Sequence, residues 1–448
     1  MKSKTPIFDF LEEYAKANGV RLHMPGHKGK GLLGVEKYDL TEIDGADSLF
    51  EANGIIAQSE ENCSKIFGAK TYYSTEGSSL SIRAMVYLAL QHAKKIGRKP
   101  LIFAGRNSHK TFLSALALLD VKVEWLYPEN FQNYLSCEIT PTEIEKALKG
   151  AKELPVAVYL TSPDYLGNIA PIGEISKTCK KYGVLLMVDN AHGGYLKFLE
   201  KSLFPIDLGA DMCCSSAHKT LPVLTGGGYL HLSNEFANNC DISPKQALSL
   251  FASTSPAYLV LASLDLANRS ILDGLGEDIN RFEKVVLKAK TALISHGYCL
   301  VGNEPLKITV RTKSYGYTGF EISQILRKKG IICEFCDPDF ITFMFSVDNG
   351  EDGVKILVES MILIPRKEEI KELPPKAFYP KTALDIRTAV LSLHEEVKTE
   401  NCLGRVLGLA NLSCPPAVPI VSCGEIINEN AIKTLKYYGI KTCVVVKK

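Results

Sequence analysis

Two charged side chains follow apolar runs that have the composition of buried strands. Asp189 ends the core of the run VLLMVDN, and His192 follows in a turn flanked by glycines. Lys219 ends the run CCSSAHK and leads into the Gly-rich segment TGGGYLH. Burying a carboxylate is costly unless it meets a cation, and burial lowers the pKa of a lysine amine towards nucleophilic chemistry. Taken singly, the aspartate could instead cap a helix or bind a metal, and the lysine could extend its amine to solvent.

A cluster of small residues, Gly77, Ser78 and Ser79, comes directly before the amphipathic stretch that begins near Leu80. Backbone N–H groups at the start of a helix can bind an anion such as phosphate, and the two hydroxyls would add donors. Capping of the helix by a serine is the simpler interpretation of this cluster when it is taken alone.

Together the three features match what a pyridoxal 5'-phosphate (PLP) site requires. The cluster of small residues would hold the phosphate, and Lys219 would form the Schiff base. Asp189, about thirty residues before that lysine, would keep the pyridine nitrogen protonated. Without that proton the ring accepts electrons poorly. The sequence therefore predicts PLP as the cofactor.

These residues must be positioned by alternating helices and strands. From about residue 66 to residue 228 the helical patterns SLSIRAMVYLALQHAKKIG, HKTFLSALALLD and EISKTCKKYG alternate with strand patterns such as LIFAG, VKVEWLY, PVAVYLT and VLLMVDN. DMCCSSAH and GGGYLHL have the composition of further buried strands. This order predicts an α/β fold with a mainly parallel sheet of at least six strands. After about residue 280 buried runs become sparser, which predicts a smaller α+β domain.

The overall charge excludes two classes of partner. The chain has 448 residues, with 52 Lys and Arg against 50 Asp and Glu, and a formal charge of +2. This balance gives no electrostatic reason to bind nucleic acid or an anionic membrane. The N-terminal segment carries acids where a signal peptide needs an apolar run, and no stretch of about 18 apolar residues occurs. We expect no nucleic-acid partner, no membrane partner and no secretion.

The thirteen cysteines are an odd number and show no paired spacing. They predict reduced thiols in the core of a cytoplasmic protein. Cys333 and Cys336 form one Cys-x-x-Cys motif, but no second pair or histidine stands at zinc spacing, so the motif predicts a buried strand and no metal site. Residues 29–34 match a dinucleotide fingerprint formally, but no strand pattern precedes them and no helical pattern follows. We therefore expect no nicotinamide cofactor.

Motifs spread from residue 23 to residue 425 resemble those of the Orn/Lys/Arg decarboxylase family. In the family's order they are HMPGHKGKG, DLTEIDGADSLFEANGII, RNSHKT, LTSPDYLGN, DNAHGGY, SSAHKTLPVLTGGGYLH, TSPAY and PPAVP followed by GE. The resemblance implies the aspartate-aminotransferase fold, fold type I of PLP-dependent enzymes. It predicts an N-terminal arm over residues 1–30, a PLP-binding large domain over 31–280 and a C-terminal α+β domain over 281–448. We expect the short form of the family, without the receiver-like N-terminal domain of its large inducible enzymes.

By this resemblance Lys219, Asp189 and His109 are the catalytic residues. Lys219 carries the cofactor, Asp189 pairs with the ring nitrogen, and His109 stacks on the pyridine ring. His192 lies near the oxygen side of the cofactor. The phosphate is held by Gly77, Ser78, Ser79, Ser216 and His218, while Thr254 and Ser255 reach the phosphate of the neighbouring subunit. The resemblance therefore implies a homodimer or a higher homo-oligomer with shared active sites.

The implied activity is PLP-dependent decarboxylation of a basic amino acid to the amine and CO2. Arginine, lysine and ornithine stay open as substrates, and polyamine biosynthesis and acid resistance stay open as roles. Two alternative functions also remain. One is another PLP-dependent reaction, such as transamination, aldol cleavage or decarboxylation of a non-basic amino acid. The other is a PLP-binding protein with little catalysis.

Three departures from the family pattern concern the substrate more than the cofactor. Asn190 stands where the family usually has glutamate, and Gly226 stands where it often has a polar residue. The family's PPGIP appears as PPAVP, from Pro415 to Pro419. These changes leave the predicted cofactor residues in place.

The substrate-binding side chains are less well defined. Glu334, Asp337 and Asp339 of EFCDPDF could face the distal cation of a basic substrate, because opposite charge is the simplest means of selecting one. A solvated acidic turn is the interpretation that we favour for these three residues. Arg405 is a candidate for binding the α-carboxylate.

Overall fold

The computed structural model describes residues 5–131, 133–410 and 417–447. By the density of its internal contacts the chain divides into two compact units. Unit 1 comprises the chain up to Lys99, Val156–Tyr159 and Ile172–Ile279. Unit 2 comprises Pro100–Pro155, Leu160–Pro171 and the chain from Asn280 onward. The boundaries predicted from sequence at residues 30 and 280 stay a prediction.

Seven strands form one mixed sheet, in the order β1-β7-β6-β5-β4-β2-β3. β5 pairs with β6 in parallel, as β2 does with β3, whereas β7 runs antiparallel to both β6 and β1. The predicted α/β class, with a mainly parallel sheet of at least six strands, is therefore confirmed. The strands are β1 Lys70–Ser74, β2 Leu101–Gly105, β3 Lys122–Leu126, β4 Ala157–Thr161, β5 Leu185–Asp189, β6 Met212–Ser215 and β7 Gly228–Leu232.

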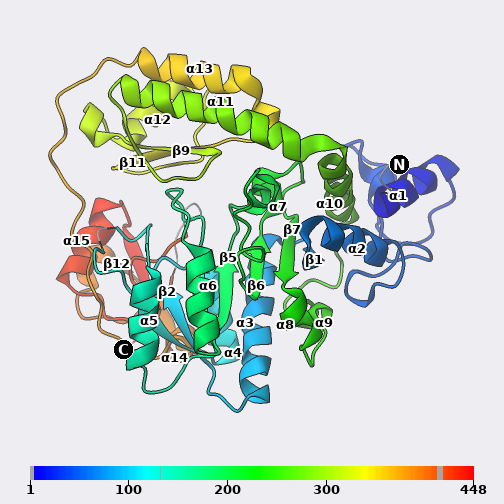
Figure 1. Ribbon diagram of the computed structural model, residues 1–448, viewed down its shortest axis with the longest axis horizontal. Coiled ribbons are helices and arrows are strands. Elements are labelled where there is room, and N and C mark those ends of the chain that lie inside the picture. Colours follow the sequence, from blue (N-terminus) through cyan, green and yellow to red (C-terminus); the bar gives the residue numbers. More distant parts are fainter. Residues whose placement is uncertain (1–4, 132, 411–416, 448) are drawn as a thin grey trace. The chain divides into compact units, whose positions relative to one another are not determined.

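Two helices of unit 1, α3 and α6, lie where helical patterns were predicted (Figure 1). The longest stretch that was predicted to be helical becomes α3, which packs on β1, β5, β6 and β7 with a buried face that includes Leu80, Ala84 and Leu88. Burial of that apolar face stabilises the helix on the sheet. The helices are α1 Pro6–Ala17, α2 Ile55–Phe67, α3 Gly77–Lys95, α6 Ile172–Lys181, α7 Ala217–Thr220, α8 Asn234–Asn238, α9 Pro244–Ser249 and α10 Tyr258–Ser270.

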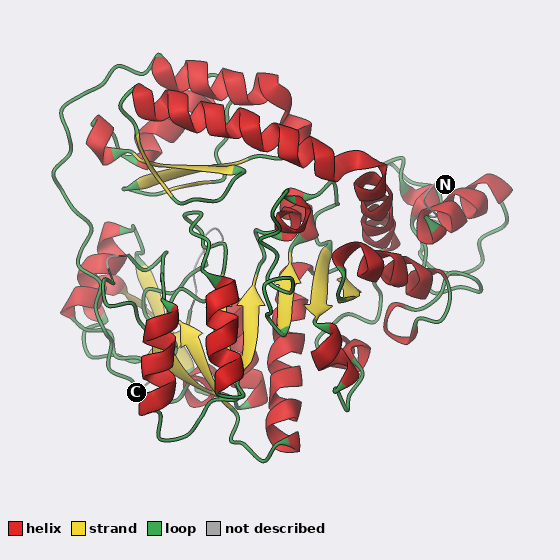
Figure 2. Cartoon of the chain, in the orientation of Figure 1, coloured by secondary structure: helices red, strands yellow, loops and turns green. Residues whose placement is uncertain are grey.

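Unit 2 contains two small antiparallel sheets besides β2 and β3 (Figure 2). One has the order β10-β11-β9-β8 and the other β12-β14-β13. Its strands are β8 Cys299–Val301, β9 Lys307–Arg311, β10 Phe335–Cys336, β11 Phe340–Met344, β12 His394–Lys398, β13 Leu407–Leu409 and β14 Thr442–Val446. Its helices are α4 Lys110–Leu119, α5 Pro141–Gly150, α12 Gly319–Arg327, α13 Gly350–Ile362, α14 Ile386–Leu391 and α15 Glu429–Tyr437, and α11 Gly276–Ser295 begins in unit 1.

The Cys-x-x-Cys segment departs from its prediction as a buried strand. β10 contains only Phe335 and Cys336, while Cys333 precedes the strand and both cysteines are half-buried. The chain bends at Glu334, which interrupts the extended backbone between the two cysteines.

Candidate active site

The start of α3 forms a tight corner after β1. The chain leaves β1 at Ser74 and enters α3 at Gly77, whose φ of +64° lies in the left-handed region. The Gly77 N–H donates to the carbonyl of Gly226 at 2.6 Å, and the Ser74 hydroxyl donates to the Gly77 carbonyl at 2.8 Å. Because glycine adopts a positive φ without steric cost, the sequence places it at this corner.

A second glycine is required where β7 begins. A Cβ on Gly228 would lie 2.8 Å from the carbonyl carbon of Gly77 and 3.0 Å from the carbonyl oxygen of Ser215. Both distances are shorter than ordinary van der Waals contact, and both neighbours are backbone atoms. The missing side chain therefore lets the first turn of α3 approach the end of β6.

Two predicted phosphate ligands meet across this approach. The Ser216 hydroxyl donates to the Ser78 hydroxyl at 2.8 Å, and the Ser78 N–H lies 3.4 Å from the Ser216 oxygen. Ser79 is the next residue of the same helical turn. The first N–H groups of a helix lack acceptors within the helix and form the positive end of its dipole. The first turn of α3 is therefore a suitable place for an anion.

His218 lies beside the same turn. It belongs to α7, and its Nδ1–H donates to the Gly227 carbonyl at 2.8 Å. Its Cε1 is 3.4 Å from the point that a Cβ on Gly77 would occupy. Burial lowers the pKa of the His218 imidazole. Unit 1 thus brings together Gly77, Ser78, Ser216 and His218, four of the residues predicted to hold phosphate.

Asp189 is the last residue of β5, as predicted, and is only 3% exposed. Its Oδ2 accepts from the Tyr159 hydroxyl at 3.2 Å. Its Oδ1 accepts from the Ala191 N–H at 3.2 Å and from the Cys214 thiol at 3.4 Å. These hydrogen bonds satisfy part of a carboxylate that is almost completely removed from water.

Lys219 lies close to His192. The Lys219 Nζ is 2.9 Å from the Nε2 of His192, which is 6% exposed. The prediction that Lys219 ends a strand is wrong, because β6 ends at Ser215 and the lysine lies in the one-turn helix α7. The turn begins where β6 reaches the edge of the sheet, so the lysine is still directly beyond a buried strand.

All of these groups lie at one edge of the sheet. Ser74, the end of β1, pairs with Gly228 at the start of β7, and Tyr229 pairs with Ser215 at the end of β6. Asp189, the end of β5, pairs with Cys214. Ligands of open α/β sheets bind beyond the carboxyl ends of the strands. Unit 1 therefore places the first turn of α3, a buried carboxylate and an amine at the edge where ligands are expected.

The sequence of residues 5–293 matches the family model of the Orn/Lys/Arg decarboxylase major domain. The chain belongs to the Orn/Lys/Arg decarboxylase family. It is 28% identical to the arginine decarboxylase of Halalkalibacterium halodurans, with 97% of this chain and 93% of that protein covered. It is 27% identical to the arginine decarboxylase of Bacillus anthracis, with 97% and 92% covered. The predicted family and the predicted amino-acid decarboxylase activity are confirmed.

Solved structures of lysine decarboxylases share the fold. The enzyme from Francisella novicida superposes with a TM-score of 0.79 at 17% identity, over 99% of this chain and 81% of that one. The constitutive enzyme of E. coli superposes with a TM-score of 0.74 at 18% identity, over 99% and 82%. At these identities the likeness concerns the fold, and it confirms the predicted fold class.

His109, predicted to stack on the cofactor ring, belongs to unit 2 of this decarboxylase. It is the N-cap of α4, and its Nδ1 accepts from the Thr111 N–H at 3.2 Å. The next residue, Lys110, donates its N–H to the Ala417 carbonyl at 3.0 Å. The stacking stays a prediction. Pro415 and Pro416, the first residues of the PPAVP motif, lie outside the described residues.

The loop before His109 is anchored by a buried ion pair. The Arg106 guanidinium donates to Glu425 at 3.0 Å, and the side chains are 4% and 2% exposed. The same guanidinium donates to the carbonyls of Pro419 and Ile420 at 2.9 and 3.2 Å. Two family motifs, RNSHKT and the late PPAVP…GE, are thereby joined in unit 2.

Thr254 and Ser255, predicted to reach a neighbouring subunit, are exposed in the loop before α10. The Ser255 N–H donates to the Ser253 hydroxyl at 3.1 Å, and the Ser253 N–H donates to Glu76 at 2.8 Å. The loop is thus tied to the residue that precedes α3. Contact with another subunit stays a prediction.

The acidic candidates for substrate binding differ in their surroundings. Asp337 and Asp339 are 5% and 4% exposed, so the prediction of a solvated turn is wrong for both. One oxygen of Asp337 accepts from two backbone N–H groups, and burial raises the pKa of this carboxyl to about 7. Asp339 lies 3.1 Å from Lys313 and accepts from Tyr437 at 2.6 Å.

Glu334 is exposed and accepts from the Tyr165 hydroxyl at 3.1 Å. Of the three acids it is the one that solvent reaches. Arg405, the candidate for the α-carboxylate, bonds Glu395 at 2.5 Å and the Val446 carbonyl at 2.8 Å. The Arg405 guanidinium therefore already has partners within unit 2.

Asn190, which departs from the family's usual glutamate, is completely buried in unit 1. Its side-chain amide donates to the Ser215 hydroxyl at 3.2 Å, and its backbone N–H donates to the Cys214 carbonyl at 3.1 Å. The substitution therefore ties the ends of β5 and β6 together.

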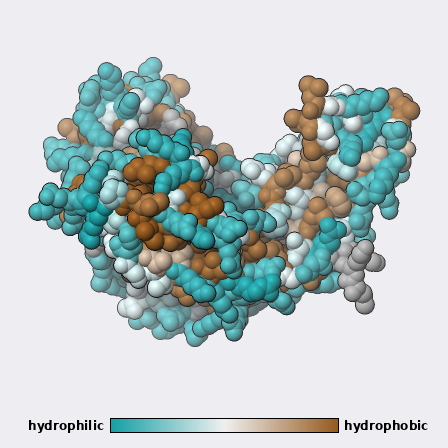
Figure 3. Space-filling view, turned by 90° about the horizontal axis from the view of Figure 1, so that it is seen from above, coloured by the Kyte–Doolittle hydropathy of each residue, from teal (hydrophilic) through white to brown (hydrophobic). Residues whose placement is uncertain are grey.

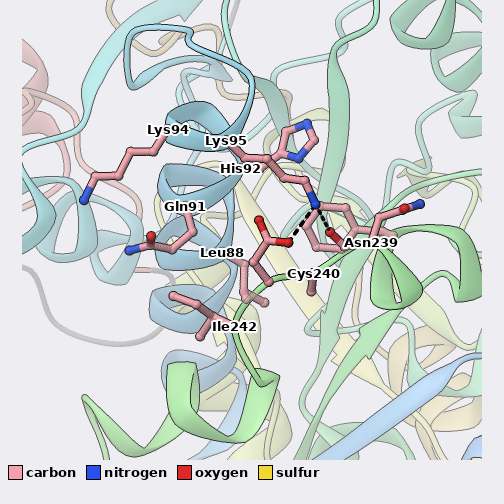
Figure 4. A pocket seen from close by; sticks show the side chains of 10 residues that line it. Leu88, Gln91, His92, Lys94, Lys95, Asn239, Cys240 and Ile242 are labelled. Carbon is pink, nitrogen blue, oxygen red and sulfur yellow. Dashed lines mark hydrogen bonds and ion pairs between the residues drawn. The ribbon is translucent and has the colours of Figure 1, made fainter.

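A cavity of about 310 Å³ lies at the C-terminal end of α3 (Figure 4). It is lined by side chains of α3 and of α8 with the segment that follows it, and the Lys95 amine spans it to bond Asp241 and the Asn239 carbonyl, each at 2.8 Å. None of the predicted cofactor residues lines this cavity. It is therefore separate from the candidate active site at the other end of the helix.

Tyr159 and Cys214 are site residues that sequence reasoning missed. They belong to the buried strands β4 and β6, and both contact Asp189. A weak signal for Tyr159 was available, since its hydroxyl interrupts the apolar run PVAVYLT and must find a partner when buried.

Proposed function

We propose that this family member decarboxylates arginine and uses PLP bound at the sheet edge of unit 1. The observation that carries this proposal is that a buried carboxylate, a lysine amine and a helix N-terminus meet at that edge. Arginine is preferred to lysine and ornithine because several relatives that match over nearly their full length are named arginine decarboxylases.

The residues at the edge fit PLP. The phosphate would bind at the first turn of α3, where Gly77 and Gly228 leave room that a Cβ would fill. Ser78, Ser79, Ser216 and His218 would supply further contacts. Asp189 would accept a hydrogen bond from the protonated ring nitrogen, and Lys219 would attach the cofactor. His109 would stack on the ring.

PLP, when bound, supplies an electron sink for the negative charge that develops at the α-carbon as CO2 leaves. The Asp189 carboxylate would favour that charge flow by keeping a proton on the ring nitrogen. Hydrogen bonds from Tyr159, Cys214 and Ala191 keep the carboxylate oriented. The contribution of this chain is therefore a fixed negative charge at the far end of the ring.

Lys219 and His192 are placed to move a proton at the reacting end. Their nitrogens are 2.9 Å apart, so a proton can pass between Nζ and Nε2 without rearrangement. After CO2 leaves, Lys219 would return a proton to the α-carbon, and His192 would keep the amine in place.

We also propose that the enzyme is a homodimer. The segment between α1 and α2 exposes apolar side chains, among them Leu22, Leu32 and Leu33, which are 90%, 104% and 82% exposed. Figure 3 shows apolar residues at the surface in the region of α1 and this segment, on the right of the view. Contiguous exposed apolar surface marks interaction sites. Sedimentation equilibrium should give twice the chain mass of 49.2 kDa.

A cytoplasmic role in polyamine supply is part of the proposal. Every cysteine among the described residues is a free thiol, as expected for a reducing compartment. Within the same described part of the chain, no helix has the length and the apolar composition needed to cross a membrane. The amine product would serve as a polyamine precursor.

The test is product formation by purified protein supplied with PLP. Arginine, lysine, ornithine and several non-basic amino acids are tested separately, and CO2 and amine are both measured. We expect equal amounts of CO2 and agmatine from arginine, and none from a Lys219→Ala variant. Lys201→Ala, at an exposed lysine, is the matched control.

Three outcomes separate the parts of the proposal. Product from lysine or ornithine alone would change the substrate and keep the reaction. Absence of CO2 while the visible spectrum shows bound PLP would overturn the decarboxylation. Absence of PLP binding would overturn the site itself.

A further inference from the structure

The Asp189 carboxylate is held by side chains from both neighbouring strands. Tyr159 of β4 donates to Oδ2 at 3.2 Å, and Cys214 of β6 donates to Oδ1 at 3.4 Å. β5 lies between these two strands in the sheet. Tyr159 and Cys214 are both completely buried. The carboxylate therefore accepts hydrogen bonds from both neighbouring strands, which fixes its rotation about the last side-chain bond.

Both side chains remain hydrogen-bond donors at physiological pH. Burial raises the pKa of the Tyr159 phenol and of the Cys214 thiol well above their usual values, and the nearby Asp189 charge adds to both effects. Each group therefore keeps its proton. Hydrogen bonds from neutral donors to an ionised acceptor are stronger than those between neutral groups. In general, hydrogen bonds donated to the charged form of a carboxyl group favour that form.

The remaining acceptor capacity of Asp189 matches one additional N–H group. A carboxylate offers about four acceptor positions. Among the described residues, Oδ1 has two donors, Ala191 and Cys214, whereas Oδ2 has one, Tyr159. One position is left on Oδ2, which suits the single N–H of a pyridinium ring.

We infer that Tyr159 and Cys214 are positioning residues that keep Asp189 ionised and oriented, so that the shared proton resides on the ring nitrogen of PLP. This inference rests on the proposed function, because it assigns Asp189 to the cofactor ring. Removing the donors lets the proton move from the nitrogen to the carboxylate, which weakens the electron sink.

The experiment measures where the proton resides. PLP labelled with 15N in the ring is bound to the holoenzyme, and its 15N NMR signal is recorded between pH 5 and pH 9. In the wild type we expect the shift of a protonated ring nitrogen at pH 7. In Tyr159→Phe and in Cys214→Ala we expect the equilibrium to move towards the carboxylate by about tenfold for each donor, which corresponds to about 1.4 kcal/mol. The double variant should show a larger shift than either.

Matched controls separate this effect from general damage to the core. Tyr229→Phe removes a phenol oxygen from a buried tyrosine on β7 that does not contact Asp189, and Cys213→Ala removes the neighbouring buried thiol on β6. Both controls should keep the wild-type 15N shift. Cys214→Ser retains a donor and should restore the wild-type signal. If Tyr159→Phe fails to fold, the comparison of Cys214→Ala with Cys214→Ser decides.

An unchanged 15N shift in the double variant would overturn the inference and leave the proposed function intact. An equal shift in the control variants would overturn it as well. If Asp189→Asn keeps the wild-type shift, or if PLP does not bind, the proposed role of Asp189 fails and the inference fails with it.

Discussion

We predict that Gly228→Ala weakens the binding of PLP far more than the binding of pyridoxal, which lacks the phosphate. The added methyl group would lie 2.8 Å from the Gly77 carbonyl carbon and 3.0 Å from the Ser215 carbonyl oxygen. Both are backbone atoms, so no flexible side chain can move aside. To restore a contact of about 3.4 Å, the first turn of α3 must move by roughly 0.6 Å.

The displacement sets the magnitude of two effects. A hydrogen bond of about 2.9 Å that is stretched by this amount reaches the limit of a real hydrogen bond. The loss of one or two such bonds to a charged phosphate costs about 1.5–3 kcal/mol each, so we expect PLP affinity to fall roughly 10- to 100-fold or more. Overpacking costs about 1–3 kcal/mol of stability, which lowers Tm by roughly 1–3 °C in a chain of this length.

The assay compares dissociation constants for PLP and pyridoxal in the wild type, in Gly228→Ala and in Gly173→Ala. A Cβ on Gly173 would meet its nearest neighbour at 3.9 Å, so this helical glycine in unit 1 is a matched control. We expect the preference for PLP over pyridoxal to collapse in Gly228→Ala alone. A variant that keeps the wild-type preference would refute the placement of the phosphate at α3. Equal weakening of both ligands would show that the substitution acts on the whole unit and not on the phosphate.

Four further outcomes follow from groups in unit 2. Glu334→Gln should raise the KM for arginine several-fold with little change in kcat, and an unchanged KM would remove Glu334 from the substrate site. Asp337→Asn should stabilise the protein against urea unfolding more at pH 8 than at pH 5. Burial raises the pKa of this carboxyl to about 7, so its ionisation destabilises the wild-type fold as the pH rises from about 4 to 7. Cys333 should reach its maximal rate of alkylation by iodoacetamide near pH 7, because a hydrogen bond from Cys336 lowers its thiol pKa to about 6; a rate that still rises at pH 9 would contradict this. Ala417→Gly should increase the free energy of unfolding by up to about 1 kcal/mol and so raise Tm slightly, because the alanine has a φ of +52° that glycine adopts without strain. A lower Tm in this variant would refute the prediction.

Local patterns in the sequence were sufficient to predict the strand and the helix that form the candidate site at the edge of the sheet. The apolar run before Asp189 ends with β5, as predicted. The helix predicted to begin near Leu80 begins at Gly77, so Gly77, Ser78 and Ser79 form its first turn. The helical turn that carries Lys219 was missed because four residues are too few for a periodic pattern.

Contacts between strands and between distant segments could not be predicted in the same way. Tyr159 and Cys214 reach Asp189 only because of the order and register of β4, β5 and β6, which no local pattern specifies. Likewise, the turn that contains Asp339 was expected to be solvated, but Lys313, far from it in sequence, buries that carboxylate. Acidic residues next to prolines look exposed until such partners are known.

The late family motif, PPAVP followed by GE, supports the loop that carries His109. Glu425 pairs with Arg106, and the Ala417 carbonyl accepts from Lys110, so this motif holds both sides of the loop that carries His109. Breaking a buried ion pair of this kind typically costs about 3–5 kcal/mol, because the remaining charge is left without a partner. The replacement of the family's glycine by Ala417 adds left-handed strain to the same support. This departure therefore acts on the stability of the His109 loop, whereas the first turn of α3, Asp189 and Lys219 in unit 1 are formed without it.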